Sequence, residues 1–431
     1  MKKILQFKLK IIAKLILKKY QPEIIGITGS VGKTSAKEAI YAVLSASFRV
    51  RRNIKNYNNE IGVPLTIIGA EAQGKNIFGW LKVFWAGFKL IIFKDKEYPE
   101  ILILEMGVDR PGDMEYLVKI AEPNIGVLTA IGETHLEFFG NIENIKKEKG
   151  VLIENIKKGG WAIINYDDEG ARTVIARSKA KILTFGSQEG AMLKVQELKF
   201  GFEEKIEADN LRGFSFKINY NGSVVPVFLP DVIGYAPVYA ALAGTAVGIT
   251  HSMNLLEISQ ALRSYRSPRG RMNLIEGQKK TLIIDDTYNS SPQSALLALE
   301  LIGKLKVASG ARKIAVLGDM LELGSYSEAG HQEVGNKVVT AGVNLLITVG
   351  GRARDIAHSA ESAGLSRDYI FSFDNAEDAG KFLQERMEEE DLIFVKGSQG
   401  MRCEKIVKEI MADPMRAEEL LVRQDREWAN K

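Results

Sequence analysis

Short apolar runs rich in β-branched residues alternate with helix-like patterns along most of the chain. From Glu23 onward these runs are IIGIT (24–28), ILILE (101–105), IGVLTA (125–130) and WAIIN (161–165), and a helical pattern follows each of them. A strand that is apolar at every position is usually buried on both faces. The alternation therefore predicts a parallel sheet with helices packed against both of its sides.

A second series of the same kind begins after residue 268, again with helical patterns between its strands. Its strands are TLIID (281–285), KIAVLG (313–318), LLITVG (345–350), YIFSF (369–373) and DLIFVKG (391–397). We therefore predict an α/β protein with two doubly wound domains, over residues 22–267 and 268–431. The segment Ser267–Gly270 is the candidate hinge between them, because Pro and Gly interrupt both kinds of regular structure.

The segment that separates the two series has a different pattern. Residues 192–229 contain short runs on either side of Asn221-Gly222, a dipeptide typical of tight hairpin turns. This pattern predicts a small antiparallel excursion from the sheet. Two helices are expected after it, near residues 236–248 and 254–263.

The composition is that of an ordinary folded protein, with one charged exception. The 431 residues are 45% hydrophobic and 26% charged, with a net charge of +4. Residues 1–20 hold seven Lys and no acidic residue, so the excess positive charge belongs to one short segment. This disfavours a nucleic-acid partner, which needs a basic face or groove. The single cysteine, Cys403, cannot form an intramolecular disulfide, which fits a cytoplasmic location.

Residues 1–21 form a separate element, which we predict to be a basic amphipathic helix. Leu5, Leu9, Ile12 and Ile16 fall on one face of that helix, and most Lys residues lie elsewhere. The segment has no cleavage site of a secretory leader, and its Lys residues interrupt it too often for it to span a bilayer. Two interpretations remain open: the helix packs against the protein, or it makes a peripheral contact with an anionic membrane.

A second unusual segment is NIFGWLKVFWAGFKLIIF (76–93), which is rich in aromatic and aliphatic residues but also contains Lys82 and Lys89. We favour a helix that faces the core, because aromatic helices are common in large cores. The alternative is a second element at a membrane interface, where amphipathic aromatic residues are also enriched.

The strongest local motif is GITGSVGKTS (26–35), which follows an apolar strand and opens a helix. Gly29 and Gly32 allow the backbone to curl around a phosphate, and the start of the helix favours negative charge. In this pattern Lys33 reaches the β- and γ-phosphates, and the Thr34 hydroxyl binds Mg²⁺. The remaining residues of the predicted nucleotide-binding loop are Ser30, Val31 and Ser35.

Three further residues suggest metal-assisted chemistry near that loop. Glu105 ends a predicted strand at the edge where open α/β sheets bind ligands, His135 follows the next strand, and Lys149 lies in a later helix. A carboxylate and an imidazole are reasonable ligands for a metal beside a triphosphate. Each residue alone also has an ordinary structural interpretation, as a solvated end, a packed ring or a surface charge.

Taken together, the motifs resemble those of the Mur ligases. In chain order they are GITGSVGKTS (26–35), NYNNEIGVP (56–64), LEMG (104–107), TAIGETHLEFFG (129–140), GRM (270–272), DDTYNSSPQS (285–294), LGDMLELG (317–324) and VKGS (395–398). The YNNE, DxYN and GDMLELG stretches are most similar to the members that add D-alanyl-D-alanine to a UDP-muramoyl tripeptide. The resemblance implies a central P-loop ATPase-like domain and a C-terminal Rossmann-like domain.

The resemblance also implies a reaction, the formation of an amide bond at the expense of ATP in peptidoglycan synthesis. A muramoyl-peptide carboxylate would be phosphorylated to an acyl phosphate, which the amine of D-alanyl-D-alanine then attacks. By similarity, Lys33, Thr34 and Glu105 serve the phosphates and a first Mg²⁺, and His135 holds a second. Lys149 matches the family lysine that is carbamylated, which would let it bind the second ion.

The same resemblance assigns roles in the C-terminal domain and around the substrate. Arg271 is expected to meet the γ-phosphate and Asp286 the ribose, with Tyr288 and Asn289 in the same loop. The expected substrate residues are Asn58, Asn59, Asp319, Glu322, Lys396 and Ser398. The protein is expected to act as a monomer in the cytoplasm, with a peripheral membrane contact through residues 1–20.

Three features depart from the family pattern. The sequence has no counterpart of the family's N-terminal UDP-sugar-binding domain, so the carboxylate substrate is expected to be held loosely or to be different, for example lipid-linked. Ala236, Pro237 and Ala240 replace polar residues near the adenine, and Val151 replaces an acid two residues after Lys149. The alternatives left open are the same ligase chemistry on another acceptor, and a membrane-associated nucleotide-binding module without ligase activity.

Overall fold

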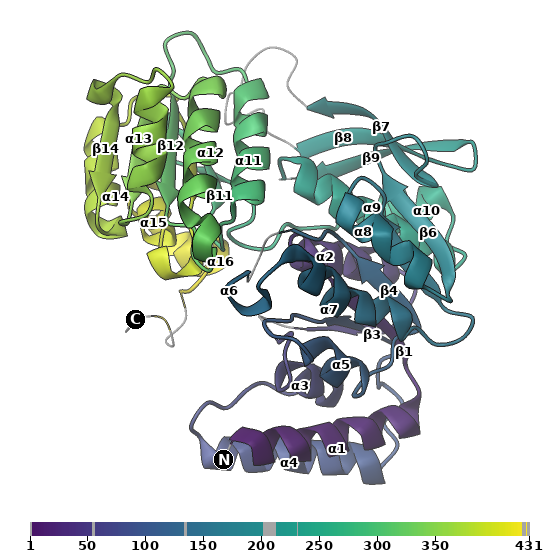
Figure 1. Ribbon diagram of the computed structural model, residues 1–431. Coiled ribbons are helices and arrows are strands. Elements are labelled where there is room, and N and C mark those ends of the chain that lie inside the picture. Colours follow the sequence, from purple (N-terminus) through teal and green to yellow (C-terminus); the bar gives the residue numbers. More distant parts are fainter. Residues whose placement is uncertain are drawn as a thin grey trace. The chain divides into compact units, whose positions relative to one another are not determined.

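The computed structural model describes residues 2–53, 57–132, 136–200, 213–230, 232–424 and Trp428 (Figure 1). The chain forms two compact units. The first unit comprises Met1–Leu198, Phe216–Phe228 and Val238–Tyr265, and the second comprises Lys199–Ser215, Leu229–Pro237 and Arg266–Lys431.

The first sheet has the strand order β2-β3-β1-β4-β5-β6-β7-β8-β9. Its strands are β1 (Glu23–Thr28), β2 (Val50–Arg52), β3 (Ile101–Glu105), β4 (Ile125–Leu128), β5 (Trp161–Asn165), β6 (Lys181–Gly186), β7 (Leu193–Phe200), β8 (Gly213–Tyr220) and β9 (Ser223–Pro230). All pairings from β2 to β7 are parallel. The predicted doubly wound α/β arrangement is therefore confirmed, and the carboxyl ends of β1, β3 and β4 lie at one edge.

The predicted hairpin is also present, at the far end of this sheet. Strands β8 and β9 are neighbours joined by Asn221 and Gly222, whose φ angles are 50° and 83°. Positive φ at both central residues is the signature of the type I′ turn, whose twist matches that of the flanking strands. This turn explains why Asn-Gly stands at this position.

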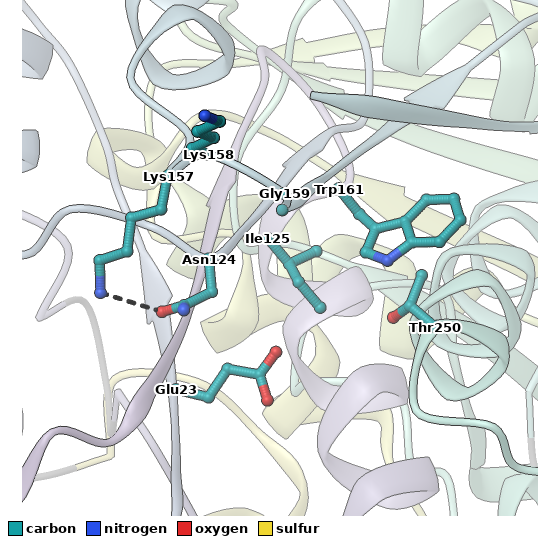
Figure 2. A pocket seen from close by; sticks show the side chains of 9 residues that line it. Glu23, Asn124, Ile125, Lys157, Lys158, Gly159, Trp161 and Thr250 are labelled. Carbon is teal, nitrogen blue, oxygen red and sulfur yellow. Dashed lines mark hydrogen bonds between the residues drawn. The ribbon is translucent and has the colours of Figure 1, made fainter. Parts of the chain in front are cut away.

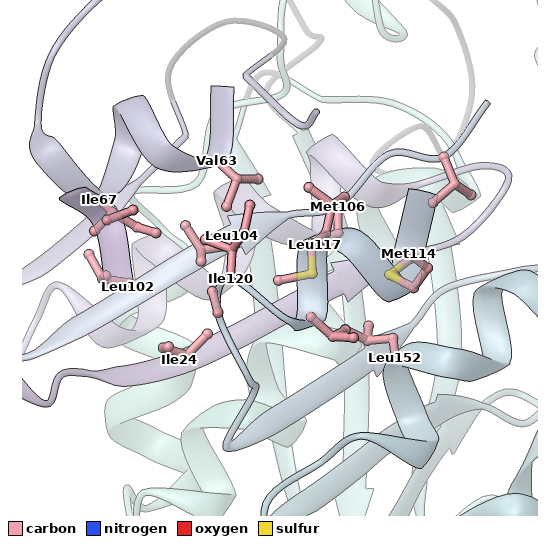
Figure 3. Packing of buried hydrophobic residues seen from close by; sticks show 14 of the residues in the cluster. Ile24, Val63, Ile67, Leu102, Leu104, Met106, Met114, Leu117, Ile120 and Leu152 are labelled. Carbon is pink, nitrogen blue, oxygen red and sulfur yellow. The ribbon is translucent and has the colours of Figure 1, made fainter. Parts of the chain in front are cut away.

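Helices cover both faces of the first sheet. They are α1 (Lys2–Tyr20), α2 (Lys33–Leu44), α3 (Gly62–Ile68), α4 (Ile77–Ile92), α5 (Asp113–Val118), α6 (Leu136–Phe139), α7 (Ile142–Glu154), α8 (Glu169–Val174), α9 (Tyr235–Thr250) and α10 (Leu255–Leu262). Figure 3 shows one of the resulting cores, in which Leu102 and Leu104 of β3 pack with Val63 of α3, Leu117 of α5 and Leu152 of α7. Every position of β3 is buried, as expected for a strand between two helical layers.

Helix α1 packs against this unit. Leu9, Ala13 and Ile16 are fully buried, so the docking interpretation of the N-terminal helix is confirmed. Helix α4 runs beside α1 (Figure 1), and the approach is close, because a Cβ added to Gly87 of α4 would lie 2.6 Å from the Cγ2 of Ile12.

The prediction that residues 76–93 form a helix facing the core is confirmed for one face of α4, where Val83 is buried and Trp80, Phe84, Ala86, Leu90 and Ile91 pack against the core. The buried residues of α4 are Gly79, Val83 and Gly87, two of which have no side chain to bury. The opposite face of α4 carries large apolar side chains that are exposed. Hydrophobic periodicity indicates which residues share a face of a helix, but not what that face contacts.

The second sheet has the order β10-β11-β15-β12-β13-β14. Its strands are β10 (Asn273–Glu276), β11 (Leu282–Asp286), β12 (Lys313–Gly318), β13 (Leu345–Val349), β14 (Ile370–Phe373) and β15 (Leu392–Lys396), and its helices are α11 (Pro292–Lys304), α12 (Ser327–Thr340), α13 (Arg354–Ser362), α14 (Ala376–Arg386), α15 (Glu404–Ile410) and α16 (Ala417–Leu420). Strand β10 pairs antiparallel with β11, and the other pairings are parallel. Helices α11, α12 and α13 pack on one face, and α14 and α15 on the other.

Three buried groups lie near the carboxyl ends of β11, β12 and β15. Glu404 is fully buried and is held by Arg402 at 2.6 Å and Arg423 at 2.9 Å. The Cys403 thiol lies against Gly318 and Gly397, where an added Cβ would come within 3.0 and 2.6 Å of its sulfur. Burial raises the pKa of this thiol to about 12, so it is a packing residue.

The third buried group is the carboxyl of Asp285. Its Oδ1 accepts hydrogen bonds from the backbone amide and hydroxyl of Thr287, at 3.1 and 2.6 Å, whereas its Oδ2 has no hydrogen-bond partner among the described residues. Burial, with smaller contributions from Asp286 and Glu404, raises the pKa of this carboxyl to about 7. The folded chain therefore keeps this proton up to about neutral pH.

This pKa predicts a pH dependence of stability with a definite sign. Because the folded chain holds the Asp285 proton more tightly than the unfolded chain, stability should fall as the pH rises from about 4 to about 7, by up to about 1.4 kcal/mol per pH unit. Asp285→Asn should flatten this part of the profile in thermal unfolding measured across pH 4 to 8, whereas the exposed control Asp368→Asn should not. Parallel profiles for Asp285→Asn and the unchanged protein would contradict the assignment.

Candidate functional site

The GITGSVGKTS segment forms a tight loop between β1 and α2. Gly29 and Gly32 have φ angles of 152° and 85°, which L side chains rarely adopt. A Cβ added to Gly29 would lie 2.0 Å from the Thr129 Oγ1. That hydroxyl in turn donates to the Val31 carbonyl at 2.6 Å. The loop is therefore anchored to the end of β4 by a contact that only glycine permits.

A second anchor lies one residue further along. The Ser30 amide donates to the Ala130 carbonyl at 2.7 Å, and the Ser30 hydroxyl bonds both the amide and the carbonyl of Gly132 at 2.9 Å. Helix α2 then begins at Lys33, where the first amides of a helix have no acceptor inside that helix. This arrangement suits an anionic group such as a phosphate.

Two lysine side chains converge on one oxygen of this loop. Lys33 Nζ donates to the Gly29 carbonyl at 2.6 Å, and Lys149 Nζ, which comes from α7, donates to the same carbonyl at 3.1 Å. The structure therefore brings together two of the predicted catalytic residues that are 116 positions apart in the sequence.

The environment of Lys149 is unusual for an ammonium group. Its side chain is buried, and burial together with the nearby charge of Lys33 lowers its pKa well below the ordinary value, although Asp109 and Glu148 oppose the shift. The Glu148 carboxylate accepts hydrogen bonds from the amides of Gly112 and Met114, at 2.9 and 2.7 Å. It therefore also holds the start of α5.

Glu105 lies at the carboxyl end of β3, beside the start of α2. Its Oε1 lies 3.3 Å from the Thr34 hydroxyl and 3.4 Å from the Asn58 amide nitrogen, and its Oε2 lies 3.8 Å from the Lys37 ammonium. Thr34, Glu105 and Asn58, which come from three predicted motifs, therefore meet at one place. A buried carboxylate next to a hydroxyl provides oxygen donors of the type that Mg²⁺ prefers.

Two residues that sequence reasoning missed hold Glu105 in place. The Glu105 amide donates to Asn53 Oδ1 at 2.6 Å, and the buried Lys37 donates to the Asn53 carbonyl at 3.0 Å. Lys37 lies one helical turn after Lys33 in α2, but its burial results from tertiary packing. No sequence signal distinguishes it from a surface lysine.

The residues present fit a Mg²⁺ that is completed by phosphate oxygens. Mg²⁺ usually takes one or two protein oxygens and obtains the rest from nucleotide and water, and Thr34 and Glu105 would supply the protein part. Within the described ranges there is no cluster of three or more His, Cys, Asp or Glu that could hold a metal alone. His135, the predicted ligand of a second ion, lies outside the described residues.

Asn59 has a structural contact at this edge. Its Oδ1 accepts hydrogen bonds from the amides of Ile61 and Gly62, at 3.1 and 3.0 Å. The side chain thereby stabilises the entry into α3. Its neighbour Asn58 is the one of the pair that reaches Glu105.

In the second unit, several predicted residues gather at the ends of β11, β12 and β15. The Lys396 ammonium lies 2.6 Å from Asp286 and donates to the Asn289 carbonyl at 2.9 Å. The Arg271 guanidinium lies over the Tyr288 ring, 4.1 Å from its centre. A carboxylate and a cation at the ends of paired strands β11 and β15 therefore stand beside the loop that carries the Tyr288 ring.

The predicted dipeptide residues lie next to this group. The Ser398 amide donates to the Asp319 carbonyl at 3.0 Å, and Asp319 Oδ1 accepts from the Ala353 amide at 2.7 Å. The Ser398 hydroxyl accepts from the Leu321 amide at 2.9 Å. Glu322 is exposed and adopts a positive φ of 64°, so Asp319 and Ser398 shape the loop on which Glu322 stands.

A hollow of about 300 Å³ lies in the first unit, away from these residues (Figure 2). Glu23, Asn124 and Trp161 line it, and they stand at the amino ends of β1, β4 and β5. Ligands of open α/β sheets bind at the carboxyl ends of the strands. The hollow is therefore not the nucleotide site.

Comparison with known families identifies the chain. The Mur ligase middle domain matches residues 27–78 and 86–248, and the Mur ligase glutamate ligase domain matches residues 270–399. The chain belongs to the Mur ligase family. These matched segments contain the loop, Glu105 and Lys149 in the first unit, and Arg271 and Asp286 in the second.

Individual relatives point to one branch of the Mur ligases. The chain is 29% identical over 404 residues to the UDP-N-acetylmuramoyl-tripeptide–D-alanyl-D-alanine ligase of Bacillus subtilis, which covers 94% of this chain and 79% of the relative. The crystal structure of the MurF ligase of Thermotoga maritima in complex with ADP is similar, with a TM-score of 0.75 and 27% identity over 94% of this chain and 83% of that one. A MurF structure from Acinetobacter baumannii has a TM-score of 0.77 at 23% identity, over 95% of this chain and 80% of that one, which supports the fold.

The contact between Gly29 and Thr129 can be tested directly. Gly29→Ala should force the loop away from β4 and abolish ADP binding in calorimetric titrations, because the added carbon has no space. Gly159→Ala is the matched control, because Gly159 also has a positive φ, of 85°, but an added Cβ there meets nothing within 4 Å. It should lose about 1–2 kcal/mol of stability and keep ADP binding. Unchanged binding by Gly29→Ala would refute the anchoring role.

Proposed function

We propose that this Mur ligase joins D-alanyl-D-alanine to the carboxylate of a UDP-muramoyl tripeptide at the expense of ATP. The observation that carries the proposal is the convergence of Lys33 and Lys149 on the Gly29 carbonyl, beside the pair of Thr34 and Glu105. A binding module would need the phosphate loop but not a second, buried lysine. The named relatives at 29% and 27% identity support the choice of substrates.

The reaction requires that a poor electrophile be activated. A substrate carboxylate oxygen attacks the γ-phosphorus of ATP, the bond to the β-phosphate oxygen breaks, and ADP leaves. The amine of the dipeptide then attacks the acyl carbon, phosphate leaves with the bonding electrons, and the nitrogen loses a proton. The Lys33 ammonium would exchange the Gly29 carbonyl for the transferring phosphoryl group and stabilise its charge.

The other predicted residues have supporting roles in this proposal. Thr34 and Glu105 would hold a first Mg²⁺, and His135 with Lys149 a second; such ions supply charge neutralisation at the phosphates. In the second unit, Arg271 would bind the γ-phosphate and Asp286 the ribose. Tyr288 and Asn289 position that loop, and Asp319, Glu322, Lys396 and Ser398 would form the dipeptide side.

The buried environment of Lys149 suits a carbamate on its side chain better than a permanently charged ammonium group. Burial and the charge of Lys33 shift this amine toward its uncharged form, whose nitrogen can attack CO₂, forming an N–C bond and releasing one proton. The product is a carbamate anion, whose oxygen atoms can bind a metal cation. Val151 provides no acidic side chain near Lys149. The acidic residue next to Lys149 in the sequence is Glu148, and its carboxylate is held by the backbone amides at the start of α5.

A second candidate is the same chemistry on a lipid-linked carboxylate. The exposed apolar side chains of α1 and α4 favour it, because they suit a protein that works at a membrane surface. Either substrate fits a cytoplasmic location. In this proposal the protein acts as a monomer, and residues 1–20 make a peripheral contact with the membrane. Residues 22–267 and 268–431 would act as the central and C-terminal ligase domains.

The substrate proposal predicts a defined pattern of phosphate release. Release from ATP should require both a UDP-muramoyl tripeptide and D-alanyl-D-alanine, and Lys33→Ala should reduce the rate by about 10²–10³. The exposed control Lys158→Ala should retain activity. Release that depends on a lipid-linked acceptor would favour the second candidate, and release without any amine would contradict both.

The carbamate predicts an effect of CO₂. Activity should fall in CO₂-depleted buffer and return with bicarbonate, and ¹³C-bicarbonate should produce a carbamate signal in the NMR spectrum. Lys149→Arg should lose both the signal and about 10² or more of the activity, because arginine stays charged. Lys147→Arg, an exposed site on the same helix, should lose neither. A fully active Lys149→Arg variant would exclude the modification.

A further inference from the structure

Helices α1 and α4 present a broad apolar face that no other described part of the chain covers. More than half of the large exposed hydrophobic side chains in the described residues lie on these two helices or at the end of α4. On α1 they are Ile4, Phe7, Ile11 and Leu15, and on α4 and just after it they are Ile77, Phe78, Leu81, Trp85, Phe88, Ile92 and Phe93. Phe78 and Trp85 are 79% and 67% exposed, far more than isolated surface residues require.

This exposed face differs from the buried face by which the helices pack against the rest of the first unit. In α1 the buried residues Leu9, Ala13 and Ile16 point to one side, and Ile4, Ile11 and Leu15 follow the helical repeat on the opposite side. Helix α1 is therefore apolar on two faces. Packing inside the unit explains one of them and leaves the other without a partner.

The two helices are joined into one rigid element. The Lys19 ammonium donates to the carbonyls of Leu90, Ile91 and Phe93, at 2.9, 3.0 and 2.7 Å. The Tyr20 hydroxyl donates toward the Leu90 and Phe93 carbonyls and accepts from the Asp95 amide at 2.9 Å. The last α4 carbonyls are thereby satisfied by α1, so the apolar residues of both helices keep a fixed relation.

The charged residues on these two helices all carry the same sign. Neither helix contains an acidic residue, and exposed lysines stand among the apolar side chains: Lys3, Lys8, Lys14 and Lys18 on α1, and Lys82 and Lys89 on α4. Such an arrangement complements an anionic surface. Two copies of this chain could not pair through the face without placing lysines against lysines, which argues against a homodimer.

Residues 79–85, in the middle of α4, fall outside the segments that match the Mur ligase middle domain. The catalytic residues named above lie inside those segments. Leu81 and Trp85 of the apolar face therefore lie in a segment that the family model does not match.

We propose that the α1–α4 face is a lipid-binding platform that lies on an anionic phospholipid bilayer. Its aliphatic and aromatic side chains enter the boundary between headgroups and acyl chains, and its lysines bind lipid phosphates. No described helix is long and apolar enough to cross a bilayer, so the platform rests on the surface. This goes beyond a contact of residues 1–20, because α4 supplies the most exposed side chains, and it does not depend on the ligase reaction.

Vesicle co-sedimentation of the full chain tests the platform. Vesicles of phosphatidylcholine mixed with phosphatidylglycerol should bind the chain, and phosphatidylcholine alone should bind it weakly. The double substitution Leu81→Glu/Trp85→Glu should weaken binding at least about tenfold. The matched control Leu256→Glu/Leu297→Glu adds the same charge at two other exposed leucines, 59% and 48% accessible, and should weaken it much less.

The lysines and the aromatic contact are tested separately. Lys14→Gln/Lys18→Gln should weaken binding by about thirtyfold at low salt, and the control pair Lys147→Gln/Lys179→Gln should have little effect. Trp85→Phe should still bind, but it should lose most of the fluorescence quenching that bromine-labelled lipids cause. Circular dichroism and thermal unfolding show whether each variant remains folded.

Three outcomes would overturn the proposal. The chain fails to bind anionic vesicles; or Leu81→Glu/Trp85→Glu binds as tightly as its control; or sedimentation velocity finds a lipid-independent dimer that the same substitution dissociates. Phosphate release assayed with soluble substrates reports the ligase reaction independently, so failure of one proposal is distinguishable from failure of the other.

Discussion

The site in the first unit depends on one backbone oxygen. The Gly29 carbonyl accepts hydrogen bonds from two lysines that come from different helices, and this is possible because Gly29 lies against Thr129 with no side chain between them. Burial of Lys149 and the neighbouring Lys33 ammonium both lower the pKa of Lys149. The loop geometry therefore places Lys149 where its pKa is lowered, beside the proposed phosphate site.

In the first unit, single residues near the loop connect two neighbouring elements. Glu148 fixes the start of α5 and stands next to Lys149 in α7, and Asn53 fixes the backbone of Glu105 while its own carbonyl holds Lys37. Side chains outside the proposed substrate contacts thus hold those that are proposed to make them. A functional group on a rigid, hydrogen-bonded frame loses little entropy when it engages its ligand.

Much of the fold was predictable because it follows from local patterns of apolar residues and turn residues in the sequence. Continuous apolar runs predicted the central strands, Asn221-Gly222 predicted the hairpin, and the loop sequence predicted the meeting of β1 and α2. Strands β2, β6 and β10 were not predicted. Strands β2 and β10 are edge strands of three or four residues, which carry too short a pattern. The burial of Lys37 and the exposure of Trp85 were not predictable either, since both depend on what packs nearby rather than on residue type. The convergence of Lys33 and Lys149 was expected only from family resemblance.

The single cysteine gives the chain a practical property. Cys403 is enclosed by Gly318 and Gly397 and holds its proton to about pH 12, so thiol reagents have neither access to it nor a thiolate to attack. A cysteine introduced on the surface would therefore be modified alone, without first removing the natural one. Spectroscopic probes could then be attached at chosen surface positions while the natural core remains intact.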